Sequence, residues 1–93
     1  MAATETDLDQ RIARTTACFL QAAADRGMFI TADSRVNESD AGDLIGYATG
    51  SLRNMRSAGA GPAYFNRPLG GYAKSYRLED LAAWVERSRE ETL

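Results

Sequence analysis

Few side chains in this chain of 93 residues could do acid–base or nucleophilic chemistry. There is no histidine, so the commonest general base, the usual nucleophilic triads and the most frequent zinc ligand are all missing. The single cysteine, Cys18, can form neither a Cys-x-x-Cys zinc pair nor an internal disulfide, which fits a reducing cytoplasm. We therefore expect no metal site and no cofactor.

Carboxylates are the remaining candidates for catalysis, since paired Asp and Glu side chains can act as general acid and base. Those that fall on stretches of helical periodicity are Glu5, Asp7, Asp9, Glu79, Asp80, Glu86, Glu90 and Glu91. A solvated helix face explains such carboxylates without any chemistry. We predict that the protein is not an enzyme.

The charges are segregated along the chain, and their distribution indicates the kind of partner. The formal net charge of −2 would by itself argue against nucleic acid. Yet the 35 residues from Leu44 to Leu78 contain no acidic residue, while the remainder carries 6 basic and 13 acidic residues. The basic residues of this acid-free segment are Arg53, Arg56, Arg67, Lys74 and Arg77. Because attraction to phosphates acts within a Debye length of about 8–10 Å, this local excess predicts a polyanion site.

A long helix is the first element that the pattern predicts, over Thr4–Arg26, with Gly27 as its left-handed end. Thr4 or Thr6 can cap its start. Its apolar face comprises Leu8, Ile12, Phe19, Leu20 and Ala23. This face either docks on the rest of the domain or pairs with a second copy, and the sequence leaves the two open. We expect Cys18 to be a small, buried or half-buried apolar residue within this helix.

Two short helices follow an extended connector, Met28–Val36, in which Phe29, Ile30 and Val36 are expected to turn inward. Asn37 or Ser39 caps the first helix, about Glu38–Ile45, and Gly46 ends it. Thr49 is the expected cap of the next helix, Gly50–Ala58. Two helices joined by a tight turn that contains glycine are typical of a helix-turn-helix.

The second of these two helices carries the side chains that could read DNA. Leu52 and Met55 lie three residues apart and must form its buried stripe. The residues then left on the outside are Thr49, Gly50, Ser51, Arg53, Asn54 and Arg56. Arg, Asn, Ser and Thr side chains pair with guanine, adenine and phosphate edges, whereas a plain surface helix usually mixes Glu with Lys. We expect Arg53, Asn54 and Arg56 to recognise bases.

Phosphate contacts are expected on both sides of that helix. Thr49 and Ser51, together with Lys74, would anchor phosphates, and the absence of a side chain at Gly50 would let the backbone approach one closely.

A basic hairpin is predicted after Gly61-Pro62, with strands at Ala63–Asn66 and Lys74–Arg77. Its turn would carry Arg67, Tyr72 and Lys74 to the DNA backbone or into a minor groove, as a wing. The alternative is an ordinary hairpin that completes the core through its aromatic residues, and both can hold for different faces. A closing helix over Leu78–Glu90 would turn Leu81, Trp84 and Val85 inward, with Trp84 as a core anchor.

The order of these features between Asp43 and Arg87 resembles the excisionase and MerR-like winged-helix family of phages and mobile elements. The segments that carry the resemblance are Leu44–Gly46, Thr49–Arg56, Gly59–Tyr64 and Tyr76–Trp84. The resemblance implies that Thr49–Arg56 enters a major groove and that the Arg67–Lys74 hairpin is the wing. Members of this family act as recombination directionality factors, as small repressors or activators, and as the DNA-binding part of phage terminase small subunits.

The expected fold is therefore mainly α with a small β-hairpin: a winged helix-turn-helix preceded by a long N-terminal helix. Residues 1–27 would form the docking or dimerisation helix, and residues 28–93 the DNA-binding domain. The expected function is sequence-specific binding of double-stranded DNA, as an excisionase-like recombination directionality factor or a small transcriptional regulator. The alternative is a protein-interaction module or a terminase-like packaging adaptor on the same fold.

The expected partners follow from this function. Double-stranded DNA is the main one, and a second copy of the chain, a recombinase or another phage protein remain open. No run of about 18 apolar residues could span a membrane, and the N-terminus lacks the pattern of a signal peptide. We expect a cytoplasmic, nucleoid-associated protein.

Overall fold

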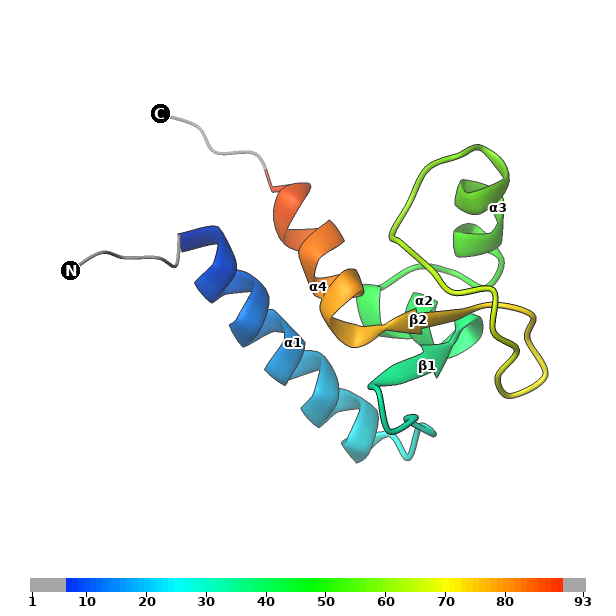
Figure 1. The fold of residues 1–93 in the computed structure, drawn as a ribbon, viewed down its shortest axis with the longest axis horizontal. Coiled ribbons are helices and arrows are strands. Elements are labelled where there is room, and N and C mark those ends of the chain that lie inside the picture. The colour runs from blue at the N-terminus through cyan, green and yellow to red at the C-terminus, as the bar shows by residue number, and fades with distance from the viewer. Residues whose placement is uncertain (1–6, 90–93) are drawn as a thin grey trace.

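The fold is mainly helical, with one small antiparallel sheet of two strands (Figure 1). It is seen in a computed structural model that describes residues 7–89. The elements in chain order are α1 (Asp7–Asp25), β1 (Arg35–Asn37), α2 (Glu38–Ile45), α3 (Ser51–Ser57), β2 (Ser75–Arg77) and α4 (Leu78–Arg87). The predicted caps Thr4 and Thr6 lie outside the described residues, as do the carboxylates Glu5, Glu90 and Glu91.

The sheet differs from the predicted hairpin. The extended connector predicted over Met28–Val36 contributes to β1, and β1 rather than Ala63–Asn66 is the strand partner of β2, with Val36 opposite Tyr76. Ala63–Asn66 contributes a single bridge, from Phe65 to Ser75. Proline flanks this segment at positions 62 and 68 and offers no N–H donor, so the ladder cannot lengthen on that side.

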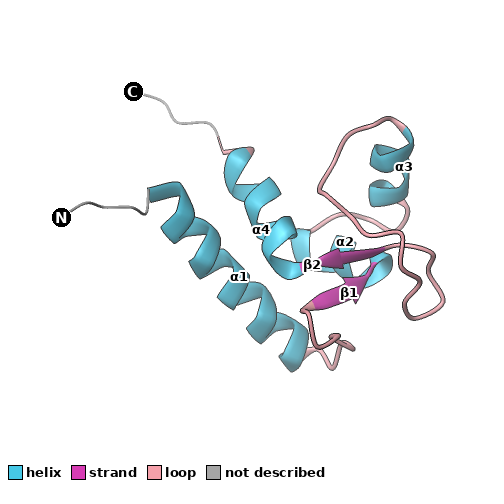
Figure 2. Cartoon of the chain, viewed as in Figure 1, coloured by secondary structure: helices cyan, strands magenta, loops and turns pink. Residues whose placement is uncertain are grey.

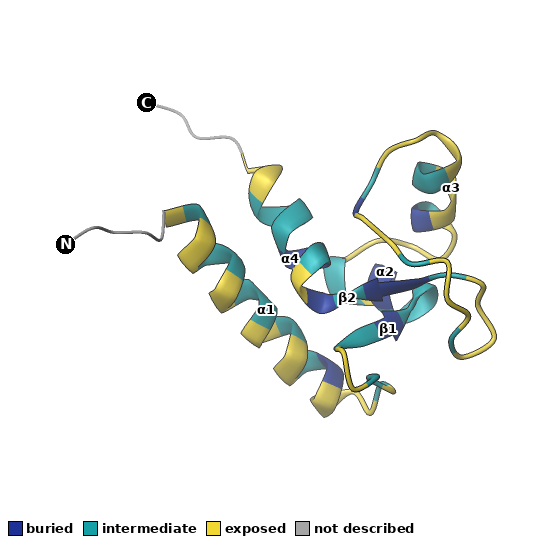
Figure 3. Cartoon of the chain, viewed as in Figure 1, coloured by how far each residue is buried: buried dark blue, intermediate teal, exposed yellow. Residues whose placement is uncertain are grey.

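The core gathers under this sheet, where β1, β2 and the helices meet (Figure 3). Its fully buried members are Val36, Ala41, Leu52, Tyr76, Leu78 and Leu81, and Phe19, Ile30, Leu44, Ile45 and Met55 pack against them half-buried. Leu52 and Met55 are therefore the inward stripe of α3, as predicted. The core draws on every helix, because an apolar helix face can be buried only against another element.

The long N-terminal helix docks on its own domain and runs beside α4 (Figure 2). The Glu86 carboxylate of α4 accepts hydrogen bonds from Nε of Arg11 at 3.2 Å and from Oγ1 of Thr15 at 2.8 Å. Phe19 packs on the core, whereas Leu20 remains 47% exposed. Most of the stripe that could have served self-association is thus occupied within one chain.

Three expectations about apolar side chains are wrong. Phe29 is 67% exposed because its neighbour Ile30 faces the core, and adjacent residues in extended chain point to opposite sides. Cys18 is exposed, since a helical step of about 100° turns it away from the inward Phe19. Trp84 is only half-buried, and its ring lies edge-on against Tyr47 at 5.9 Å between ring centroids.

The helix ends position the region between α2 and α3. Asn37 caps α2, its Oδ1 accepting from the backbone N–H of Asp40 at 2.7 Å, and Gly46 ends the helix with φ 84°. The N-cap residue of α3 is Gly50, with φ 90° and no side-chain cap, so the expectation that Thr49 caps the helix is wrong. Both glycines adopt the left-handed conformation that turns the chain sharply between the two helices. No helix between residues 7 and 89 is long and apolar enough to cross a membrane.

Candidate nucleic-acid interface

The outer face of α3 exposes a basic and an amide side chain. Arg53 and Asn54 are both exposed, and Ser51 is half-buried at the start of the helix. On the inner face, Leu52 is 3% exposed and contributes to the core. A single buried anchor thus directs Arg53 and Asn54 to solvent, as the sequence predicts.

Arg56 does not project outward, which corrects the prediction for this residue. Its Nε and Nη2 donate to the Glu38 carboxylate at 2.6 and 2.9 Å. The two side chains are only 18% and 12% exposed. Arg56 is held here because Glu38, one residue into α2, lies directly across from it and accepts both donors of the planar guanidinium. Arg56 is therefore engaged inside the protein.

Tyr76 completes this cluster from the sheet. Its hydroxyl donates to Oε2 of Glu38 at 2.6 Å. The hydrogen bonds from the Arg56 guanidinium hold the pKa of Glu38 below its ordinary value, although burial of the carboxylate works in the opposite direction. Burial is the main cause that raises the pKa of Tyr76. Glu38 thus stays charged and Tyr76 stays neutral near neutral pH.

Tyr64 connects α3 to the residues before β2. The guanidinium of Arg56 lies 5.6 Å from the centroid of the Tyr64 ring, and the ammonium of Lys74 lies 5.9 Å from it. The ring of Tyr76 lies 6.1 Å away at a tilt of 49°. Lys74 also donates from Nζ to Oδ1 of Asn66 at 2.6 Å. The stem of the 66–74 loop is therefore adjacent to α3.

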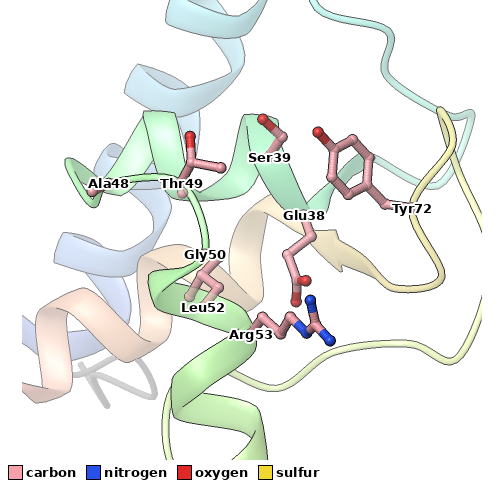
Figure 4. A pocket seen from close by; sticks show the side chains of 9 residues that line it. Glu38, Ser39, Ala48, Thr49, Gly50, Leu52, Arg53 and Tyr72 are labelled. Carbon is pink, nitrogen blue, oxygen red and sulfur yellow. The ribbon is translucent and has the colours of Figure 1, made fainter.

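A cavity of about 190 Å³ opens between α2, the turn before α3 and the 66–74 loop (Figure 4). Its walls include Thr49, Gly50, Arg53 and Tyr72, which the sequence had selected from two separate segments. Glu38, Ser39, Gly42, Ala48 and Leu52 complete the lining. The predicted helix-turn-helix and the predicted wing thus meet at one surface, on the side of the molecule opposite α1 (Figure 1).

The five cations of the acid-free segment divide into two groups. Arg56 and Arg77 are paired with Glu38 and Asp33. Within residues 7–89, no carboxylate forms an ion pair with Arg53, Arg67 or Lys74. These three cations remain available to an external anion.

A second cluster, around Asp33, was not foreseen from the sequence. Asp33 accepts from Arg35 at 2.9 Å and from Arg77 at 3.2 Å, and both guanidinium groups lie over the Phe65 ring. The hydrogen bond from the Thr31 hydroxyl, followed by that from Arg35, holds the pKa of Asp33 well below its usual range. The signal for this cluster was the Thr-x-Asp turn before β1, but its partner Arg77 is 44 residues away along the chain. The cluster holds β1 against β2 and the Phe65 bridge.

No group of three or more His, Cys, Asp or Glu side chains in the described part of the chain could hold a metal ion. Comparisons of the chain with protein-family models, with curated protein sequences and with solved structures find no match. The function proposed next therefore depends on the geometry and charge of the chain itself.

Proposed function

We propose that the chain binds double-stranded DNA in a sequence-specific manner, as a winged helix-turn-helix protein. In this arrangement α3 lies in the major groove, α2 crosses the backbone above it, and the 66–74 loop is the wing. The observation that carries the proposal is the surface where Arg53 of α3 and Tyr72 of the 66–74 loop line one cavity, with no carboxylate in an ion pair with Arg53 within residues 7–89.

The chemistry of this surface suits duplex DNA. Arg53 can donate two hydrogen bonds to guanine, and Asn54 can pair with adenine, which are the commonest contacts of a major-groove helix. Thr49, Ser51 and Gly50 at the start of α3, and Arg67 and Lys74 on the loop, suit phosphates. The basic segment is acid-free over 35 residues, and Glu38, the carboxylate that lines the cavity, is paired with Arg56.

The proposed biological role is that of an excisionase-like recombination directionality factor or a small regulator of transcription, acting in the nucleoid. Both roles need a small protein that recognises DNA sites without catalysis, and the exposed Arg53 and Asn54 of α3 support such a role. A second copy of the chain or a recombinase would be a further partner on such DNA.

The experiment is a selection of duplexes from a random pool by the purified chain, followed by affinity measurements on the selected and a scrambled duplex at two salt concentrations. We expect an enriched motif and an affinity for it that exceeds that for the scrambled duplex at least tenfold, weakening with salt. Failure to enrich any motif, with no binding of duplex DNA at low salt, would contradict the proposal. Binding to a recombinase or virion protein in the absence of DNA affinity would instead support the interaction-module alternative.

A further inference from the structure

We propose that Glu38 is a positioning residue that fixes the orientation of α3, and hence of Arg53, for the recognition of DNA sequence. The inference rests on the proposed function of the same surface. A carboxylate near DNA ordinarily weakens binding by repulsion, whereas this one would favour specific binding by positioning α3.

Glu38 joins three elements through one carboxylate. From its place as the first residue of α2, it accepts two hydrogen bonds from Arg56 of α3 and one from the Tyr76 hydroxyl of β2. Tyr76 is itself fixed, because it is fully buried and lies opposite Val36 in the sheet. Glu38 thereby links α3 to the sheet, where Val36 and Tyr76 are fully buried, and this link fixes the orientation of α3.

α3 has few other contacts that could fix its orientation, because its apolar side consists of Leu52 and Met55 alone. In this helix, all of which the structure describes, Leu52 is the one buried residue. The helix packs mainly on α2 among the described elements. Leu52 and the half-buried Met55 hold this seven-residue helix on the core from one side, and the two hydrogen bonds of Arg56 add a directional contact that limits its rotation.

Arg53 feels the same carboxylate. It lies one turn before Arg56, lines the cavity next to Glu38, and its positive charge contributes to the lowered pKa of Glu38. Glu38 therefore holds α3 through Arg56. It also attracts the side chain of Arg53, which remains exposed. Arg56 in turn keeps the carboxylate from repelling a phosphate.

Two explanations of Glu38 give opposite expectations for Glu38→Gln. If the side chain were only a negative charge near DNA, its removal would strengthen binding to every duplex. If it positions α3, its removal lowers the preference for the selected duplex while binding to scrambled DNA stays equal or becomes tighter. Glu79→Gln is the matched control, because Glu79 is an exposed carboxylate on α4 and the substitution changes the net charge equally.

The experiment compares the full chain with these two variants on the selected and the scrambled duplex. We expect Glu38→Gln to reduce the ratio of the two affinities about three- to thirtyfold, the range of coupling through packed networks, and Glu79→Gln to leave it unchanged. A ratio that stays at the wild-type value in Glu38→Gln, with both affinities raised by one factor, would overturn the inference. If the wild-type chain itself has no sequence preference, the proposed function fails instead.

Two milder variants keep the test decisive if Glu38→Gln does not fold, as judged by circular dichroism. Tyr76→Phe keeps the buried ring and removes one hydrogen bond to Glu38, and Arg56→Lys keeps the charge but loses the two-point contact. We expect both variants to lower the ratio of the two affinities. Tyr76→Phe should lower it less than Glu38→Gln does. An unchanged ratio in both folded variants would overturn the inference.

A double variant separates position from charge. Arg56→Met leaves the Glu38 carboxylate unpaired and should weaken binding to both duplexes, since an uncompensated negative charge then faces the phosphates. Adding Glu38→Gln to Arg56→Met should restore affinity for scrambled DNA but not the ratio. Recovery of the full ratio in the double variant would show that charge alone matters and would contradict the positioning role.

Discussion

At the scale of single residues, the acid-free segment separates into side chains that hold the protein together and side chains left for a partner. Arg56 and Arg77 are bound by carboxylates of α2 and of the turn before β1. Arg53 and Arg67, with no ion-paired carboxylate between residues 7 and 89, face solvent. Residue type alone could not separate these groups, because both consist of arginines in the same short stretch.

Substitution at α3 and at the loop should have different effects on DNA recognition. Arg53→Ala or Asn54→Ala should relax sequence preference by about 1–3 kcal/mol at one or two base positions, because each removes a contact to a base edge. Lys74→Ala and Arg67→Ala should weaken binding to all duplexes by similar factors, because loop contacts go to the backbone. The measurement is a matrix of these variants against the selected duplex and its single-base changes. Equal losses on selected and scrambled DNA for Arg53→Ala would argue against base recognition by α3.

The lowered pKa of Glu38 predicts how stability changes in acid. The folded chain keeps this carboxylate charged at pH values where the unfolded chain has already bound a proton, so the contribution is present above the ordinary value of 4.5 and is lost as pH falls through the folded pKa. The lowered pKa of Asp33 likewise makes stability fall in acid. Burial raises the pKa of Asp40 and Asp80, which partly offsets this loss of stability.

We therefore expect Glu38→Gln to flatten the fall in unfolding free energy below about pH 4.5, measured by urea denaturation from pH 7 to pH 3. Glu79→Gln serves as control for the change in net charge. A variant curve parallel to that of the wild type would show that the ion pair contributes nothing to acid stability.

At the scale of elements, the 66–74 loop is tied to the start of α2 and does not extend freely into solvent. A Cβ placed on Gly70 would lie 2.7 Å from Nδ2 of Asn37. Asn37 is the cap of α2, and the next residue is Glu38, so the loop, the cap and the positioning cluster are contiguous. The loop therefore has a fixed place beside α3.

Gly70→Ala tests this contact, with Gly71→Ala as its matched control. Both glycines have positive φ, of 58° and 85°, so both substitutions strain the backbone, but a Cβ on Gly71 would meet nothing within 4 Å. We expect Gly70→Ala to destabilise the fold by about 0.5–2 kcal/mol more than Gly71→Ala, because it displaces the Asn37 cap. Thermal and chemical denaturation measure the difference. Equal losses would mean that the Asn37 side chain moves aside at no cost.

At the scale of the whole molecule, a net charge of −2 coexists with a basic segment because the acidic residues of the described chain lie outside this segment, on α1, α2, α4 and the turn before β1. α1 and α4 carry acidic side chains in their first turns, and both lie on the side away from α3 and the 66–74 loop (Figure 1). The docking of α1 on α4 also occupies most of the stripe that could have formed a dimer. In the proposed DNA binding, this charge asymmetry would orient the chain toward the polyanion.

The salt dependence of DNA binding measures how many cations meet phosphates. If Arg53 contacts bases while Arg56 and Arg77 stay paired internally, Arg67 and Lys74 remain for phosphates, so the slope of log affinity against log salt should be about −2 per monomer. Lys74→Ala and Arg67→Ala should each make the slope shallower by about one unit. Titrations from 50 to about 300 mM salt measure it. A slope near zero would exclude a phosphate-binding surface.

The sequence by itself determined the local features of this protein. Asn37 and Gly46 set the ends of α2, helical spacing selected Leu52 and Met55 as the inward stripe of α3, and the distribution of acids marked the basic segment. Each of these depends on residues within a few positions of one another, where periodicity and backbone preference carry the information.

Only the tertiary structure decided which strand pairs with β2, where α1 docks and which arginines remain free. β1 pairs with β2 across about 40 residues, Tyr76 reaches Glu38 across 38, and Thr15 reaches Glu86 across 71. The sequence does not distinguish these partners from others, because several segments have a similar apolar pattern and several carboxylates could bind Arg56. Burial selects among them, because a carboxylate and a guanidinium that lose their hydration on folding are stable only when they pair with each other.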